Sequence, residues 1–282
     1  MKNAFYENIN TATYDYPHME FNKENLTYLS HFHNEIELIY FYEGSISVFC
    51  DNKKTEGKAG DIFIFMPGQI HSFISTEPNK YHLWKLRCEN EMDGTDFSKL
   101  RTACTPIDRN GELYKKLLSD IKECLDEKAS PKQGQAYFFN SFANKTVGNI
   151  LRYGNLVNID KKQDKISKFN TDFLNKVNEY IEKNYTEKIT ILQIAKYCGF
   201  SEYYFAHTFK KITGATFFEH LTIFRLNKAI NIHINTKKPL TETVFDCGFT
   251  NTRSFYRLFK KHFLVTPKEY INKMKNSDFD NI

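Results

Sequence analysis

The sequence predicts an α+β protein in which a β-barrel is followed by helices and then by an all-α C-terminal half. Two observations support this fold class. Short apolar runs between turn residues fill residues 15–90, a pattern typical of an all-β domain. Further along, the apolar spacing becomes helical and one phrase occurs twice, as Cys198-Gly199-Phe200 before Phe209-Lys210-Lys211 and as Cys247-Gly248-Phe249 before Phe259-Lys260-Lys261.

The composition is that of a folded chain with room for two domains. The 282 residues are 41% hydrophobic and 26% charged, which excludes a disordered protein. No run of about 18 apolar residues occurs, so we expect no membrane span and no membrane partner. Residues 1–10 lack the apolar stretch of a signal peptide, and we therefore expect a cytoplasmic protein.

The six cysteines are scattered without C-x-x-C pairs, so the spacing predicts neither a zinc site nor a disulfide framework. We expect reduced thiols in a cytoplasmic chain. Cys198 and Cys247 precede turns and are expected to pack inward.

The positive charge of the chain is concentrated near its C-terminal end. Of the net charge of +5, the excess lies after residue 170, where 17 Lys and Arg stand against 11 Asp and Glu. This is the segment that carries the repeated phrase, and it is where phosphate contacts would be needed.

The predicted barrel covers residues 1–110. Its strand candidates are Ile36–Tyr42 and Ser45–Phe49, arranged as a hairpin around Glu43-Gly44, then Asp61–Phe65 and Tyr81–Leu86. Helical spacing follows at Glu112–Lys128 and Gln135–Tyr153, in a region of 111–158 that either caps the barrel or pairs two copies of the chain. The charge-rich stretch of 159–170 is interpreted as a linker, and helical pattern resumes in a C-terminal domain of 171–282.

Each copy of the repeated phrase predicts a helix, a Gly turn and a second helix. This is the outline of a helix-turn-helix unit, whose second helix enters the major groove of DNA. In the first copy Thr190 and Ser201 are the predicted N-caps of helices over Ile191–Tyr197 and Glu202–Ile212. Phe205 and Phe209 should face the core. The outward residues that we expect to meet double-stranded DNA are Tyr203, Tyr204, His207 and Lys210.

The second copy repeats this arrangement 49 to 50 residues later. Thr241 is the predicted cap of its first helix, and Thr250 or Asn251 caps the second. Its expected DNA-facing residues are Thr252, Arg253, Tyr256, Arg257 and Lys260. Arg253 or Arg257 can donate two hydrogen bonds to a guanine edge, whereas the lysines are phosphate contacts or solvated charge.

A predicted helix over Phe217–Asn235 joins the two units. At ~1.5 Å per residue it spans roughly 28 Å. Successive major grooves on one face of DNA lie about 34 Å apart, so one chain can place both recognition helices in adjacent grooves.

Residues 171–273 resemble the AraC/XylS family of bacterial transcription regulators. The resemblance rests on Gly248-Phe249, Phe255, Phe259-Lys260-Lys261, Thr266-Pro267 and Tyr270, and on Arg225-Leu226 with Ala229. It implies two helix-turn-helix units joined by a linker helix, a homodimer formed through the helices between 111 and 155, and RNA polymerase as a partner if the protein activates transcription. Three positions depart from the family pattern: Leu264 stands where Gly is usual, Phe217 where Pro is usual, and His207 at a usually basic position.

The N-terminal half contains a second pattern, made by His31, His33, Glu37, Gly44 and, downstream, His71. It resembles the two motifs of the cupin barrel, although Pro67 lies one place late and Ser75 stands where Asn is expected. In metal-binding cupins the ligands would be His31, His33, Glu37 and His71, a set suited to Fe, Mn, Ni or Zn. These residues alternatively line an effector pocket or are structural, and no cofactor is expected beyond a divalent metal as the alternative.

The leading hypothesis is a transcription regulator, not an enzyme, that binds DNA in response to a small-molecule effector such as a carbohydrate. A constitutive regulator with a vestigial barrel is one alternative. A metal-dependent cupin enzyme with a DNA-binding tail is another.

Overall fold

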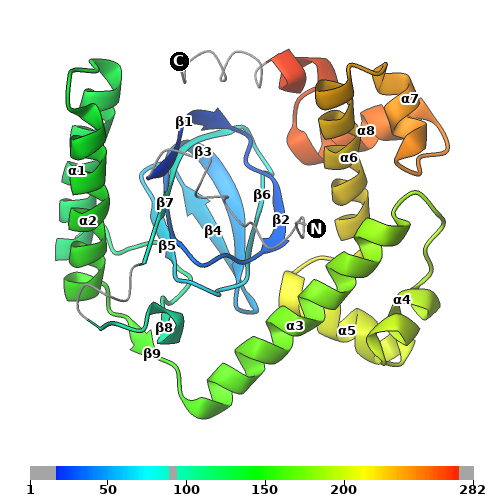
Figure 1. Ribbon diagram of the computed structural model, residues 1–282, viewed down its shortest axis with the longest axis horizontal. Helices are drawn as coiled ribbons and strands as arrows, with labels where there is room; N and C mark the ends of the chain where they lie inside the picture. Colours follow the sequence, from blue (N-terminus) through cyan, green and yellow to red (C-terminus); the bar gives the residue numbers. More distant parts are fainter. Residues whose placement is uncertain (1–16, 89–93, 273–282) are drawn as a thin grey trace.

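The computed structural model describes residues 17–88 and 94–272. A curled sheet occupies the centre of the molecule, one pair of helices lies on one side of it, and the C-terminal helices lie on the other side (Figure 1). The predicted fold class, a cupin-like barrel followed by a helical half, is confirmed. Within the described ranges, no helix is long and apolar enough to cross a membrane.

The barrel is an antiparallel sheet built around one long strand, β3. The strands are β1 (His18–Glu24), β2 (Tyr28–His31), β3 (Ile36–Cys50), β4 (Lys53–Lys58), β5 (Ile62–Phe65), β6 (His71–Ile74) and β7 (Asn79–Leu86). Strand β3 pairs with β4, β5, β6 and β7, and β2 and β1 extend the sheet at its two ends. Because one strand contributes to both halves of the sheet, the sheet has to curl.

The predicted hairpin at Glu43-Gly44 is wrong, because β3 runs without interruption through these residues. Gly44 has a φ of +75°, and the pairing with β7 shifts register between Phe41 and Glu43. A Cβ at Gly44 would lie 1.9 Å from the carbonyl oxygen of Pro78. The glycine therefore marks a bulge that bends a continuous strand, although a glycine at such a position is equally typical of a hairpin turn.

The helices α1 (Glu112–Ala129) and α2 (Gln135–Tyr153) follow a short helix η1 (Phe97–Lys99) and the two-residue strand β8 (Leu100–Arg101). They contact each other and pack on the barrel, where the ring of Phe142 lies 5.7 Å from that of Trp84. Strand β9 (Val157–Asn158) then returns to pair with β8. Within one chain these helices therefore cover a face of the sheet, which is the capping arrangement.

The segment interpreted as a linker, 159–170, is largely helical. Helix α3 begins at Lys161 and ends at Asn184, and the side chains of Asp160 and Gln163 form a capping box at its start. Its first half is tied to the barrel side by an ion pair from Lys99 to Asp164 at 2.9 Å. The segment lacks apolar periodicity because contacts between charged groups, and not burial, hold its first turns.

The C-terminal half contains α4 (Ile191–Cys198), α5 (Glu202–Thr213), α6 (Phe217–Thr236), α7 (Leu240–Asp246) and α8 (Thr252–Phe263). The predicted N-caps Thr190 and Ser201 are confirmed, and Asn251 is the cap of α8. Thr241 is not a cap, since α7 begins at Leu240 after Pro239. Proline fixes φ just ahead of the helix and so sets its first residue.

The cysteines divide into two groups. Cys198 and Cys247 are buried as predicted. Cys50 and Cys104 form a disulfide with a Cα–Cα distance of 5.7 Å, so the expectation of six reduced thiols is wrong. The two residues are 54 positions apart, and only the curl of the barrel brings them together.

Candidate DNA interface and histidine cluster

Helix α5 presents one apolar and one polar face. Phe205 and Phe209 are fully buried, and their rings lie 5.7 and 5.8 Å from that of Phe217 in the C-terminal core. On the opposite face the four predicted DNA-facing residues, Tyr203, Tyr204, His207 and Lys210, are all exposed. Tyr203 is 83% exposed, which is unusual for a large aromatic side chain and leaves its ring available to a partner.

Helix α8 has the same organisation. Phe255 and Phe259 are buried, whereas Arg253, Tyr256, Arg257 and Lys260 are exposed. Thr252, at the first turn, is half-buried. The exposed residues of α8 offer two guanidinium groups and a lysine from one short helix, which is the donor chemistry that base edges and phosphates accept.

Leu264 ends α8 in the left-handed region, with a φ of +61°. Its N–H donates to the carbonyl of Lys260 at 3.0 Å. Gly214 fills the corresponding place after α5, with a φ of +76° and the same bond to Lys210. Leu264 therefore forms the same turn after α8 that Gly214 forms after α5. The left-handed conformation of this turn costs a non-glycine residue ~1–2 kcal/mol.

His31, His33, Glu37 and His71 converge inside the barrel from β2, the residues after it, β3 and β6. All four are buried, and one potential ligand atom from each lies within 4.8 Å of those of the others. The predicted grouping of these four residues is therefore what the fold produces.

Backbone carbonyls orient the three imidazoles. The Nδ1 atoms of His31, His33 and His71 lie 2.9, 3.0 and 2.9 Å from the carbonyl oxygens of Leu29, Glu35 and Gln69. A carbonyl only accepts hydrogen bonds, so each Nδ1 carries a proton, and any of these rings that is neutral has its lone pair on Nε2.

The Nε2 atoms of two rings face the carboxylate of Glu37. That of His33 lies 3.2 Å from Oε2, and that of His71 lies 3.5 Å from Oε1. Among the described residues, neither Nε2 of His71 nor Oε1 of Glu37 has a hydrogen bond. Lone pairs that face a carboxylate are favourable only when a cation lies between them, either a proton or a metal ion.

Lys85, a residue of β7 that the sequence motif does not contain, also reaches Glu37. Its buried Nζ lies 3.5 Å from Oε2. Burial alone would raise the pKa of Glu37, but the groups facing it, His71 and Lys85 first, hold that pKa well below its usual range. Burial lowers the pKa of His31 well below its usual value and lowers that of His33. The cluster therefore combines two neutral imidazoles with an anionic carboxylate.

The segment just before His31 contacts both helix-turn-helix units. The Thr27 hydroxyl donates to the carbonyl of His262 in α8 at 2.7 Å, and the Ser30 hydroxyl donates to the carbonyl of Thr213 in α5 at 3.0 Å. Leu29, Phe32 and Ile70 belong to the same apolar core as the C-terminal helices. Sequence reasoning missed this contact because no pattern along the chain links residues that far apart.

Comparison with known proteins agrees with both halves of this description. Residues 19–140 match the AraC-like ligand binding domain, and residues 194–273 match a helix-turn-helix domain. The TetD protein of transposon Tn10 from Escherichia coli is 33% identical over 119 residues, which are 42% of this chain and 86% of that protein. The chain belongs to the AraC family of transcription regulators.

Two other proteins and one solved structure are similar to different lengths of this AraC-family regulator. The uncharacterized HTH-type transcriptional regulator YdiP of Escherichia coli is 25% identical over 248 residues, 86% of this chain and 80% of that protein. The bifunctional transcriptional activator/DNA repair enzyme AdaA of Bacillus subtilis is 34% identical over 109 residues, which are 38% of this chain and only 52% of AdaA. The structure of ToxT from Vibrio cholerae with an unsaturated fatty acid covers 90% of this chain and 93% of its own, at 14% identity and a TM-score of 0.46.

Proposed function

We propose that this AraC-family regulator binds double-stranded DNA through α5 and α8 and that a ligand at His31, His33, Glu37 and His71 controls this binding. The assignment of DNA contacts to Tyr203, Tyr204, His207 and Lys210 in α5, and to Thr252, Arg253, Tyr256, Arg257 and Lys260 in α8, is supported by the exposure of all but the half-buried Thr252. One observation carries the proposed control: the segment that ends in His31 also hydrogen-bonds to both recognition helices.

The control follows from the geometry of β2. Thr27 and Ser30 bind carbonyls in the last turns of α8 and α5, where helices have unpaired acceptors. His31 is the next residue after Ser30 and contributes to the cluster. A ligand that repositions His31 therefore changes how both α5 and α8 pack against the barrel. Its differential affinity for the two arrangements supplies the free energy of the response.

We propose a divalent transition-metal ion as the ligand. Three Nε2 lone pairs and one carboxylate make a set that suits Fe, Mn, Ni or Zn. The backbone carbonyls behind Nδ1 are the outer partners that usually orient histidine ligands. In the bound state His31, His33, His71 and Glu37 would hold the ion. Its positive charge would offset the repulsion between the Nε2 lone pairs and the carboxylate of Glu37. A carbohydrate effector stays a prediction.

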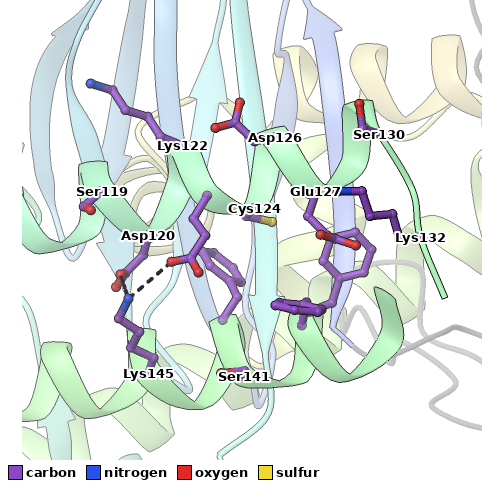
Figure 2. Close-up of a pocket in the computed structure, with 14 residues that line it drawn as sticks. Ser119, Asp120, Lys122, Cys124, Asp126, Glu127, Ser130, Lys132, Ser141 and Lys145 are labelled. Atoms are coloured by element: carbon purple, nitrogen blue, oxygen red, sulfur yellow. Dashed lines mark hydrogen bonds and ion pairs between the residues drawn. The ribbon is translucent and has the colours of Figure 1, made fainter. Parts of the chain in front are cut away.

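We further propose that the protein acts as a homodimer, without enzymatic activity, in the cytoplasm and with RNA polymerase as a partner when it activates transcription. A hollow of about 590 Å³ lies between α1 and α2. Figure 2 shows it lined by charged side chains such as Lys122, Asp126 and Lys145. Nearby Tyr137 is 82% exposed and Phe138, which lines the hollow, is 55% exposed. Exposed aromatic rings beside a groove support pairing of two copies through these helices.

The proposed domains are a barrel over 1–110, a helical region over 111–158 and a DNA-binding domain over 171–282. Helix α3 begins within 159–170, the segment predicted to be a linker, and its residues Phe173 and Leu174 pack in the C-terminal core. The boundary therefore lies inside a continuous helix.

The test is selection of bound duplexes from a random pool at a stated salt concentration, with and without added Zn²⁺. We expect an enriched site with two elements about one helical turn apart, and a change in affinity on adding the ion. The double variant His31→Ala with His33→Ala should bind the same site but lose the response to Zn²⁺. Enrichment that none of Zn²⁺, Mn²⁺, Fe²⁺ or Ni²⁺ affects would contradict metal control. If no duplex is enriched in any condition, the proposal that α5 and α8 both recognise DNA sequence is contradicted.

A further inference from the structure

The disulfide between Cys50 and Cys104 lies directly behind the histidine cluster. Cys50, the last residue of β3, is the register partner of His71 in β6. Cys104 lies in the coil between β8 and α1 and is flanked by exposed Ala103 and Thr105. Cys50 is completely buried and Cys104 is 4% exposed, so Cys104 is the member of the pair that lies nearer to the surface.

Gln69 connects the two cysteines to His71. Its Nε2 lies 3.3 Å from the Sγ of Cys104 and donates to the carboxylate of Asp51 at 2.9 Å. Its Oε1 accepts from the backbone N–H groups of Met66 and Thr102. Its backbone carbonyl accepts from Nδ1 of His71 at 2.9 Å. Gln69 is fully buried, so its side chain beside Cys104 and its backbone carbonyl beside His71 are both closely packed.

The other four cysteines are not paired. Burial raises the pKa of Cys88 and Cys124 to about 12 and that of Cys198 and Cys247 to about 11. These thiols stay protonated near neutral pH and react slowly. Redox chemistry of the chain is thus directed to the Cys50–Cys104 pair.

We propose that Cys50 and Cys104 form a reversible thiol–disulfide site for a low-molecular-weight thiol, and that Gln69 passes the state of this site to His71. The exchange itself is independent of the function proposed above. The consequence for ligand binding at His71 rests on that function.

The exchange takes place in two balanced steps. A small thiolate attacks the Sγ of Cys104, the Cys50–Cys104 bond breaks, and Cys50 leaves as a thiolate that takes up a proton. A second small thiolate attacks the small-molecule sulfur of the mixed disulfide, which releases the Cys104 thiolate and one molecule of small disulfide. Two small thiols are oxidised and one protein disulfide is reduced, and oxidised small disulfide reverses the reaction.

Reduction changes the surroundings of Gln69. The two sulfur atoms move from bonding to van der Waals distance, and Cys104, held at a φ of +58°, can relax because the coil is no longer tethered. The Gln69 amide then loses its fixed contact at Cys104. Because outer partners of a metal ligand typically change affinity by about 10–100-fold, we expect the reduced and oxidised proteins to differ by on the order of tenfold in Co²⁺ affinity.

The first experiment equilibrates the full chain with reduced and oxidised glutathione at a series of ratios and then counts alkylated thiols by intact mass. We expect a single two-electron transition between six and four free thiols. Cys104→Ser should abolish the transition, and Cys88→Ser, a matched barrel variant outside the pair, should keep it. A pair that stays oxidised at every ratio, or that never forms, overturns the proposal.

The second experiment follows the ring signal of His71 by NMR, assigned by its loss in His71→Asn. We expect the signal to differ between the oxidised and reduced proteins, and we expect Gln69→Leu to remove the difference while thiol exchange continues. An unchanged His71 signal in the parent overturns the coupling. If the signal moves but neither form binds Co²⁺, the thiol site stands and the proposed metal response fails.

Discussion

The hydroxyl of Ser30 donates a hydrogen bond to the carbonyl of Thr213, 3.0 Å away and 183 residues later in the chain. The acceptor lies in the last turn of the first recognition helix, and the donor is the residue before His31. Together with the bond from Thr27 to the carbonyl of His262, this contact joins the barrel to the helix-turn-helix domain.

Ser30→Ala should destabilise the protein by about 1–3 kcal/mol, because the carbonyl of Thr213 loses its donor while it stays buried. Urea unfolding measures this change. We also expect a weaker effect of Zn²⁺ on DNA affinity in the variant. Thr236→Ala is the control, since the Thr236 hydroxyl binds within its own helix at an exposed position. If Zn²⁺ changes the DNA affinity of Ser30→Ala as much as it changes that of the parent protein, β2 does not transmit the signal.

At position 264 we expect a glycine variant to be more stable than an alanine variant, which reverses the usual order in helices. In a helix interior glycine is about 1 kcal/mol less stable than alanine. At the φ of +61° found for Leu264, we expect Leu264→Gly to be about 1 kcal/mol more stable than Leu264→Ala in thermal unfolding.

Gly214 provides the comparison in the first unit. A Cβ there would lie 2.6 Å from the ring of Phe49, so Gly214→Ala should be destabilising both through its positive φ and through this clash. If Leu264→Ala is the more stable of the two Leu264 variants, the left-handed turn does not persist in solution.

Lys85→Met should raise the affinity of the cluster for Zn²⁺ by roughly tenfold or more, because a buried ammonium 3.5 Å from Glu37 repels a second cation. A competition titration with a chromophoric chelator measures the dissociation constant. Lys80→Met is the matched control, since Lys80 also lies in β7 but forms an exposed pair with Glu43. Equal or weaker binding by Lys85→Met would place the ion away from Glu37.

The stability of the protein should fall on acidification, in part through His220. Burial in α6 lowers the pKa of His220 from 6.5 to about 3. Between these values the unfolded chain holds a proton that the folded chain does not, so stability is lost as the pH falls from 6.5 towards 3. In urea unfolding between pH 6 and 4, His220→Leu should reduce the slope of stability against pH by about 1.4 kcal/mol per unit. Equal slopes in the two proteins would contradict this assignment.

Arg253→Ala or Arg257→Ala should cost about 1–3 kcal/mol of binding free energy at the selected site if that arginine reads a base. Fluorescence anisotropy on the selected duplex and on scrambled duplexes measures the difference. Lys53→Ala, at an exposed position in β4, is the control for a general loss of positive charge. Equal weakening on all duplexes would instead identify the arginine as a phosphate contact.

The sequence by itself determined the features that depend on neighbouring residues. The caps at Thr190 and Ser201 and the buried pairs Phe205–Phe209 and Phe255–Phe259 follow from helical spacing, and all are found in the structure. The grouping of His31, His33 and Glu37 was also predictable, because the three lie within seven residues, whereas His71 was predicted only from the resemblance to the cupin motifs. These patterns are local, and local backbone geometry fixes which side chains share a face.

Only the tertiary structure decided how the parts act on one another. The path of β3 through Gly44 and the pairing of Cys50 with Cys104 each depend on elements distant in sequence. The same holds for Lys85 beside Glu37 and for Ser30 beside Thr213. Such contacts are selected by burial and hydrogen bonding across the closed fold, where partners are set by curvature and packing and leave no periodic mark along the chain.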